Sequence, residues 1–166
     1  LRLFVEALDR LDAPSAPARP RRAARLGDAD ALGDLIARSA AYVLAHGTLL
    51  HPFPRVLSFA QRDCGYLLLT VVIGNHYAQS VQGAALNLPL RRRDLADRLQ
   101  VSTAHIGSLL ADAEAKGWFS VGPGGHLAAL DAAFLAEFER WSVWQMAHFE
   151  WLGEAQATKG LQLEVS

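Results

Sequence analysis

The sequence has little of several residue classes that mark common groups of proteins. Its 166 residues include one cysteine, which excludes an internal disulfide and leads us to expect a cytoplasmic protein. The longest apolar run, residues 66–73, is far short of the roughly 20 residues that span a bilayer, so we expect no membrane partner. The net charge of −1 lacks the basic excess typical of many proteins that bind polyanions.

Sequence patterns of the common catalytic and metal sites are also missing. The chain contains no glycine-rich phosphate loop and no serine nucleophile elbow. Cys64 and His76 are twelve residues apart on one expected helix, which places them about 120° apart and unsuited as nucleophile and base. His46, His51 and Asp63 complete a possible metal set, but their spacing fits no ligand motif. We therefore expect no enzyme, no catalytic residue, no metal site and no cofactor.

The charges that are present are unevenly distributed. Residues 1–90 carry nine arginines against seven acids, and residues 91–121 carry five bases against four acids. Residues 122–166 carry two bases against six acids. The C-terminal part is therefore a poor match for phosphate, whereas the stretch before and into the helix that begins near Arg91 is compatible with it.

Before residue 90 the pattern is mainly helical. Residues 1–11 have an apolar helical face, and residues 13–25 contain three prolines and four arginines, which indicates an exposed linker. The alternative is an arm whose arginines reach phosphate or a minor groove. We expect a helix over 28–46 that ends at Gly47, a short helix near 55–60, and a buried helix, apolar nearly all round, from 62 to about 81. A strand is expected at 86–90.

Two short amphipathic helices follow, separated by a turn of about three residues. Leu95, Ala96 and Leu99 form the apolar stripe of the first, which begins near Arg91, and the second repeats the spacing i, i+3, i+4, i+7 from Ile106 to Ala113. Such a turn makes the helices cross steeply. Ser102 or Thr103 is expected to cap the second helix, and Gly117 to end it.

Residues 118–121 and 126–130 flank Gly122-Pro-Gly-Gly125, a pattern that predicts a β-hairpin with a tight turn. The order helix, turn, helix, hairpin over residues 86–130 resembles the bacterial winged helix-turn-helix transcription regulators, such as the MarR-like group and the DNA-binding domains of Crp-like regulators. Two departures concern Gln100, where the family often has glycine, and the hairpin tip, which lacks arginine and lysine.

The resemblance implies that the second helix, about 103–116, enters the major groove of double-stranded DNA. With its apolar stripe turned inward, the residues expected to face the groove are Ser102, Thr103, Ala104, His105 and Ser108. Phosphate affinity is expected from arginines at and within the first helix, namely Arg91, Arg92, Arg93 and Arg98. The second helix has no arginine for a guanine contact, so specificity is expected to be modest. A protein-interaction module that keeps this fold without binding DNA is the alternative.

The last helix, 131 to about 152, is rich in aromatic residues and includes three of the four tryptophans. We expect a homodimer that buries this surface, through Phe134, Phe138, Trp141, Trp144 and Trp151. The alternative is that the helix only folds back on residues 28–82. Its aromatics, with Tyr42, Phe53, Tyr66 and Tyr77, could also line a pocket for a small-molecule effector whose identity the sequence does not give.

The sequence thus predicts a mainly α-helical protein, a winged helix-turn-helix with additional N-terminal helices and a long C-terminal dimerisation helix. Its expected parts are residues 1–25 as N-terminal helix and linker, 26–85 as a helical region, 86–130 as the winged part and 131–166 as the last helix and tail. The expected function is that of a DNA-binding transcription regulator.

Overall fold

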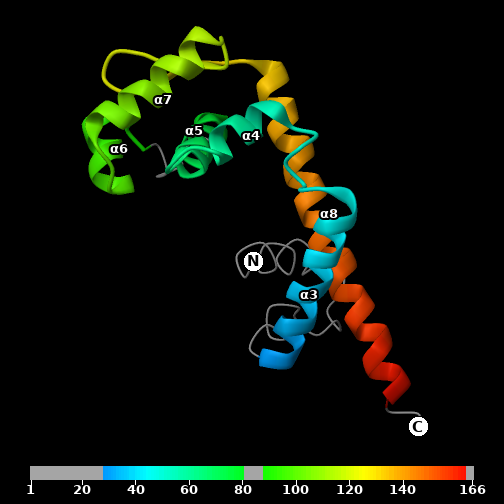
Figure 1. Ribbon diagram of the computed structural model, residues 1–166. Coiled ribbons are helices and arrows are strands. Elements are labelled where there is room, and N and C mark those ends of the chain that lie inside the picture. The colour runs from blue at the N-terminus through cyan, green and yellow to red at the C-terminus, as the bar shows by residue number, and fades with distance from the viewer. Residues whose placement is uncertain (1–27, 81–87, 164–166) are drawn as a thin grey trace. The chain divides into compact units, whose positions relative to one another are not determined.

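The computed structural model describes residues 28–80 and 88–163, with side chains as far as residue 152. Within these ranges the protein is mainly helical (Figure 1) and has a small antiparallel sheet of two strands. The described residues fall into two compact units, residues 28–51 with 141–163, and residues 52–140. The helix expected at 1–11 and the linker expected at 13–25 lie outside the described residues.

The first unit contains α3, Ala29–His46, whose two ends are those expected. The Asp28 carboxylate accepts hydrogen bonds from the amides of Asp30 and Ala31, at 2.9 and 3.2 Å, and so satisfies two of the free donors at the helix start. Gly47, at φ 83°, ends the helix, because glycine adopts this left-handed conformation without steric cost.

In the same unit α3 packs on the second half of α8, Ala132–Leu163. His148 is buried here, with its Nε2 at 3.3 Å from Ser39 Oγ and its ring at 4.7 Å from that of Tyr42. Burial lowers the pKa of His148 below its ordinary value of 6.5, because a charged imidazolium is poorly solvated between the two helices.

The second unit begins with α4, Pro54–Ala60, and α5, Gly65–Ser80. The expected start of α5 at Arg62 is wrong, since residues 61–64 form a tight turn in which Cys64 has φ 50°. A side chain at Gly65 would collide with the carbonyl oxygen of Phe59. Only a residue without Cβ therefore lets the chain reverse so closely behind α4.

Helix α5 is buried on one side and exposed on the other. Its core side is formed by Leu68, Leu69, Val72, Ile73 and Asn75. The expectation of burial nearly all round is wrong for the other side, where Leu67 and Tyr77 remain 51% and 44% exposed. The Tyr77 hydroxyl donates to Glu139 Oε1 at 2.6 Å, and this hydrogen bond, with smaller effects of burial and of the Glu139 charge, raises the pKa of Tyr77 to about 12.

Asn75 fixes the point at which the chain returns to α5 after residue 87. Its amide nitrogen donates to the Leu88 carbonyl at 2.7 Å, and its amide oxygen accepts from the Leu88 N–H at 2.8 Å. The strand expected at 86–90 is not found at 88–90, and residues 86 and 87 lie outside the described residues. Pro89 has no N–H to offer a ladder, and Leu90 makes a single backbone bond of 2.7 Å to Gly125.

The expected pair of helices follows as α6, Arg92–Leu99, and α7, Thr103–Ala115. Both contribute apolar stripes to the core, which consist of Leu95, Ala96, Ile106, Leu109, Leu110 and Ala113. Helix α6 packs on α7 and also touches α5 (Figure 1). The apolar spacing of the sequence therefore predicts the inner faces of both helices correctly.

The expected hairpin is formed by β1, Phe119–Val121, and β2, Leu127–Leu130. Phe119 pairs with Leu130 and Val121 with Leu127, and the register shifts between Ser120 and Val121, as in a β-bulge. The turn holds Gly124 and Gly125 at φ 85° and 83°, so it depends on glycine at both positions.

Helix α8 starts at the expected cap, where Asp131 Oδ1 accepts from the amide of Phe134 at 2.8 Å. Its continuation to Leu163 makes it longer than the expected end near residue 152. Phe134 is fully buried and stacks on Trp118 with ring centroids 5.5 Å apart, beside Phe59 and Phe119. This aromatic cluster joins the start of α8 to α4 and the hairpin.

Buried Glu137 on α8 supplies the cap that α4 lacks in its own sequence. Phe53 precedes α4 and has no side-chain acceptor. Glu137 Oε1 instead accepts from the amides of Arg55 and Val56, at 2.7 and 3.3 Å. A carboxylate at this end of a helix also interacts favourably with the helix dipole.

Candidate nucleic-acid interface

The turn between α6 and α7 has the geometry that the sequence indicates. Gln100 is left-handed, at φ 56° and ψ 43°, and its side-chain nitrogen donates to the Asp97 carbonyl at 2.6 Å. The local hydrogen bond compensates part of the strain of a non-glycine residue in this conformation. Ser102 is the cap, accepting from the His105 amide at 3.1 Å.

The outward face of α7 consists of small and mostly uncharged residues. The exposed positions at its start include Ser102, Thr103 and Ala104, and further along the same face lie Ser108, Ala111 and Ala115. Positions 104, 108, 111 and 115 follow one another at helical spacing, and we call these four residues the α7 ridge. The ridge permits close approach to a partner but carries no charge of its own.

His105 does not project from α7 as the sequence predicts. It is half-buried, and its Nε2 donates to the backbone carbonyl of Asp63 at 2.9 Å. The expectation that His105 faces outward is therefore corrected, because the turn at 61–64 occupies its hydrogen-bonding nitrogen. Ser108 stays exposed, but its hydroxyl accepts from Arg62 Nη2 at 3.2 Å.

Arg62 is the residue at this face that the sequence does not single out. Its Nη1 lies 3.0 Å from Asp112 Oδ2, and Lys116 Nζ lies 2.8 Å from the same oxygen. The hydrogen bond from Lys116 lowers the pKa of Asp112 below its ordinary value; desolvation opposes this effect, and the charges of Lys116 and then Arg62 add to the lowering. The carboxylate is thus ionised and holds two cations beside the α7 ridge.

Of the arginines predicted at and within α6, Arg92 lies on the other side of α7. Arg91, Arg92, Arg93 and Arg98 are all exposed. The Arg92 guanidinium lies beside Gly107, where an added Cβ would be 3.5 Å from Arg92 Nη1. The α7 ridge is therefore flanked by Arg62 on one side and by Arg92 on the other.

Arg91 supplies a cation to the hairpin, whose own tip has none. Its Nε donates to the Gly124 carbonyl at 2.9 Å, and Leu90 and Arg91 fill the space that a side chain at Gly125 would need. The sequence alone shows a bare hairpin tip, whereas the structure brings a guanidinium to it from the residue before α6.

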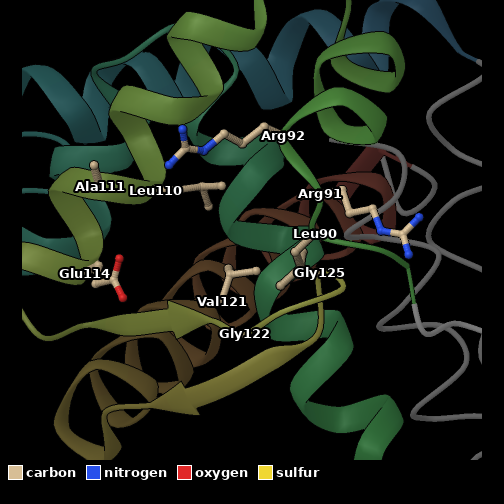
Figure 2. A pocket seen from close by; sticks show the side chains of 9 residues that line it. All are labelled: Leu90, Arg91, Arg92, Leu110, Ala111, Glu114, Val121, Gly122 and Gly125. Carbon is tan, nitrogen blue, oxygen red and sulfur yellow. The ribbon is translucent and has the colours of Figure 1, made fainter.

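An open cavity of about 310 Å³ lies between the start of α6, the second half of α7 and the hairpin. Figure 2 shows Arg92 extending over it towards α7, Glu114 on the opposite side and Arg91 pointing away. Leu90, Leu110 and Gly125 are buried around it. The cavity thus combines an apolar floor with one cation and one anion at its edge.

Acidic side chains limit the positive character of this surface. Asp94 and Asp97 on α6 and Glu114 on α7 are exposed. Of the cations nearest the α7 ridge, Arg62 and Lys116 are partly neutralised by Asp112. The free positive charge therefore comes mainly from α6 and the residue before it.

The residues predicted for a dimer interface differ in their exposure. Phe134 is fully buried and Trp141 is 5% exposed, so these two side chains lie within the folded chain and are not surface residues. Phe138 is half-buried. Trp144 and Trp151 are 50% and 51% exposed, and they remain candidates for a contact with a second molecule.

Other kinds of site have little support in the described parts of the chain. No group of three or more histidine, cysteine or acidic side chains there could hold a metal ion. Burial, together with the Asp63 charge, raises the pKa of the Cys64 thiol, which disfavours the nucleophilic thiolate. Among the described helices, none is long and apolar enough to cross a membrane.

No protein-family model, no curated protein and no solved structure matches this chain.

Proposed function

We propose that this protein is a DNA-binding transcription regulator of the winged helix-turn-helix type, in which α7 enters the major groove. The observation that carries the proposal is the exposed α7 ridge between arginines, beside a hairpin that Arg91 anchors. The major groove of B-DNA is wide enough to admit an α-helix, whose outward side chains then meet the base edges.

In this proposal the arginines of α6 and its start contribute most of the affinity. Arg92, Arg93 and Arg98 are exposed, and each guanidinium that neutralises a phosphate releases a counterion. Ser102 and Thr103 at the start of α7 supply hydroxyls to phosphates or base edges. The exposed Asp94, Asp97 and Glu114 oppose binding, so we expect moderate affinity and strong salt dependence.

We further propose that the protein is a homodimer through α8, with Trp144 and Trp151 at the contact. Val143, 64% exposed, extends this apolar surface. Exposed aromatic side chains on one helix are typical of a self-complementary interface. Dimeric helix-turn-helix proteins bind two half-sites that lie about 34 Å apart on the duplex.

The test measures binding of the full chain to a labelled duplex over a range of salt concentrations. The triple variant Arg92→Ala, Arg93→Ala, Arg98→Ala should lower the salt slope by up to about 3, at roughly 0.9 per phosphate contact. Arg91 is left unchanged because it also anchors the hairpin. Arg140→Ala, which removes an exposed arginine of α8 outside this surface, serves as the matched control and should bind like the unmutated chain.

The second candidate function is a protein-interaction module, and the uncharged α7 ridge together with Asp112 and Glu114 is the observation that favours it. The salt titration separates the two. Binding to neither random nor genomic duplex at low salt would refute the DNA-binding proposal and favour a protein partner.

A further inference from the structure

The outward face of α7 lacks an arginine in its own sequence, yet an arginine lies against it. Arg62, from the turn between α4 and α5, is separated from Ser108 and Asp112 by 46 and 50 residues in the chain. Its two terminal nitrogens bind these two side chains at 3.2 and 3.0 Å. The guanidinium therefore lies along the second and third turns of α7, at the border of the α7 ridge.

Contacts on both elements hold this arginine in place. Asp112 is itself fixed by Lys116 at 2.8 Å. The turn that carries Arg62 is held to α7 by the hydrogen bond from His105 to the Asp63 carbonyl, and to α4 by the close approach at Gly65. An arginine held in this way loses less side-chain entropy when it binds a ligand than a freely rotating one.

The side chain still has capacity to bind a partner. A guanidinium has five N–H donors, and the contacts to Ser108 and Asp112 use one on each terminal nitrogen. About 31% of the Arg62 side chain is exposed. Ala104 and Ala111 on the neighbouring ridge present no bulk that would keep a base edge away from it.

We infer that Arg62 is the arginine that reads a guanine in the major groove, in place of one on α7 itself. This inference rests on the proposed DNA-binding function. Arginine donates two parallel hydrogen bonds to N7 and O6 of guanine, which is the commonest specific contact in protein–DNA complexes. Ser108 and Asp112 set the orientation of the guanidinium, and the arginines of α6 bind phosphates without reading sequence.

A purely structural brace between the turn and α7 would have the same contacts but different consequences. Loss of a brace lowers stability and weakens binding to all duplexes by the same factor. Loss of a base-reading arginine changes the ranking of sequences at one position of the site. Sequence preference, measured with thermal stability, therefore separates the two roles.

The experiment selects binding sites from a randomised duplex library with the full chain and then measures affinities for single-base variants of the selected site. The unmutated chain should prefer guanine at one position of each half-site by roughly 5- to 100-fold. In Arg62→Ala this preference should fall to about twofold or less, while the preferences at other positions persist. Arg140→Ala should keep the complete preference.

Arg62→Lys keeps a cation beside Asp112 and so tests the inference even if Arg62→Ala does not fold. It should retain binding to random duplex but lose most of the guanine preference, because lysine lacks the planar pair of donors. An unchanged guanine preference in a folded Arg62 variant would overturn the inference and leave the proposed function intact. Failure of the unmutated chain to bind any duplex at low salt would overturn the proposed function, and the inference with it.

Discussion

Replacement of Asn75 by leucine should destabilise the protein more than any conservative change on the surface of α5. The side chain is 1% exposed, and it satisfies both backbone groups of Leu88 with hydrogen bonds of 2.7 and 2.8 Å. Leucine has the same branched arrangement of heavy atoms but cannot form either bond. Both polar groups of Leu88 would then be left without their partner next to an apolar side chain.

The expected cost follows from those two groups. An unsatisfied buried donor or acceptor costs about 1–3 kcal/mol. Leu88 itself is half-buried, so water can reach part of this backbone, and we expect a total near the lower limit, about 2–4 kcal/mol. Urea denaturation followed by far-UV circular dichroism measures this change through the transition midpoint at constant slope.

The matched control is Gln79→Ala on the same helix. Gln79 is exposed, and its amide makes a long hydrogen bond of 3.4 Å to the Leu127 carbonyl. Its loss should change the free energy of unfolding by less than about 0.5 kcal/mol. A cost below about 1 kcal/mol for Asn75→Leu, or equal costs for the two variants, would refute the role given to Asn75.

Four further predictions concern α8 and its contacts. Glu137→Ala should lower the free energy of unfolding by about 1–3 kcal/mol because the Arg55 and Val56 amides lose their acceptor. Glu137→Gln should retain most of that stability, since its amide oxygen can still accept. Equal losses for the two variants in urea denaturation would contradict the capping role of Glu137. Phe134→Ala should lower the free energy of unfolding by about 3–5 kcal/mol, because it opens a cavity among Phe59, Trp118 and Phe119. Trp144→Asp should leave folding intact and convert the proposed dimer to monomers, as measured by analytical ultracentrifugation. The pKa of His148 in the folded protein lies below 6.5, so the unfolded chain binds a proton at this residue at higher pH than the folded chain does. Stability should therefore fall as the pH drops below about 6.5 towards the folded pKa. This decline should be shallower in His148→Phe, and identical pH profiles of stability for the two proteins would exclude the effect.

The elements set by local sequence are those that could be predicted. Asp28 and Ser102 act as caps, Gly47 ends a helix, and two glycines form the hairpin turn. Each depends on residues close together in the chain, whose preferences follow from backbone sterics and short-range hydrogen bonds. The inner faces of α6 and α7 are equally visible, because apolar spacing repeats with the helical period.

The features that sequence could not reveal depend on long-range contacts. The position of Arg62 beside Ser108 depends on the reversal at Gly65, and in the sequence Arg62 resembles an ordinary helix start. Helical spacing predicts that His105 faces outward, but the Asp63 carbonyl lies against it. The strand predicted at 86–90 is wrong at 88–90 because both backbone groups of Leu88 are hydrogen-bonded to the Asn75 side chain, a contact that the sequence does not show.

The charge of the surface around α7 also depends on contacts that the sequence does not show. Counting residues gives a small basic excess over residues 91–121. Within that range Lys116 is held on Asp112, which also binds Arg62 from an earlier part of the chain, and Arg91 is brought to the hairpin. The salt dependence of the proposed DNA binding should therefore change more when the exposed arginines of α6 are replaced than when the net charge is changed elsewhere.

The most direct test of the central claim maps the contact surface of the unmutated full chain by NMR during titration with duplex DNA at low salt. The account predicts that amide signals from the start of α6, the first two turns of α7 and the hairpin turn shift together. Shifts confined to other elements, or none at all, would contradict the assignment of this surface as a DNA interface.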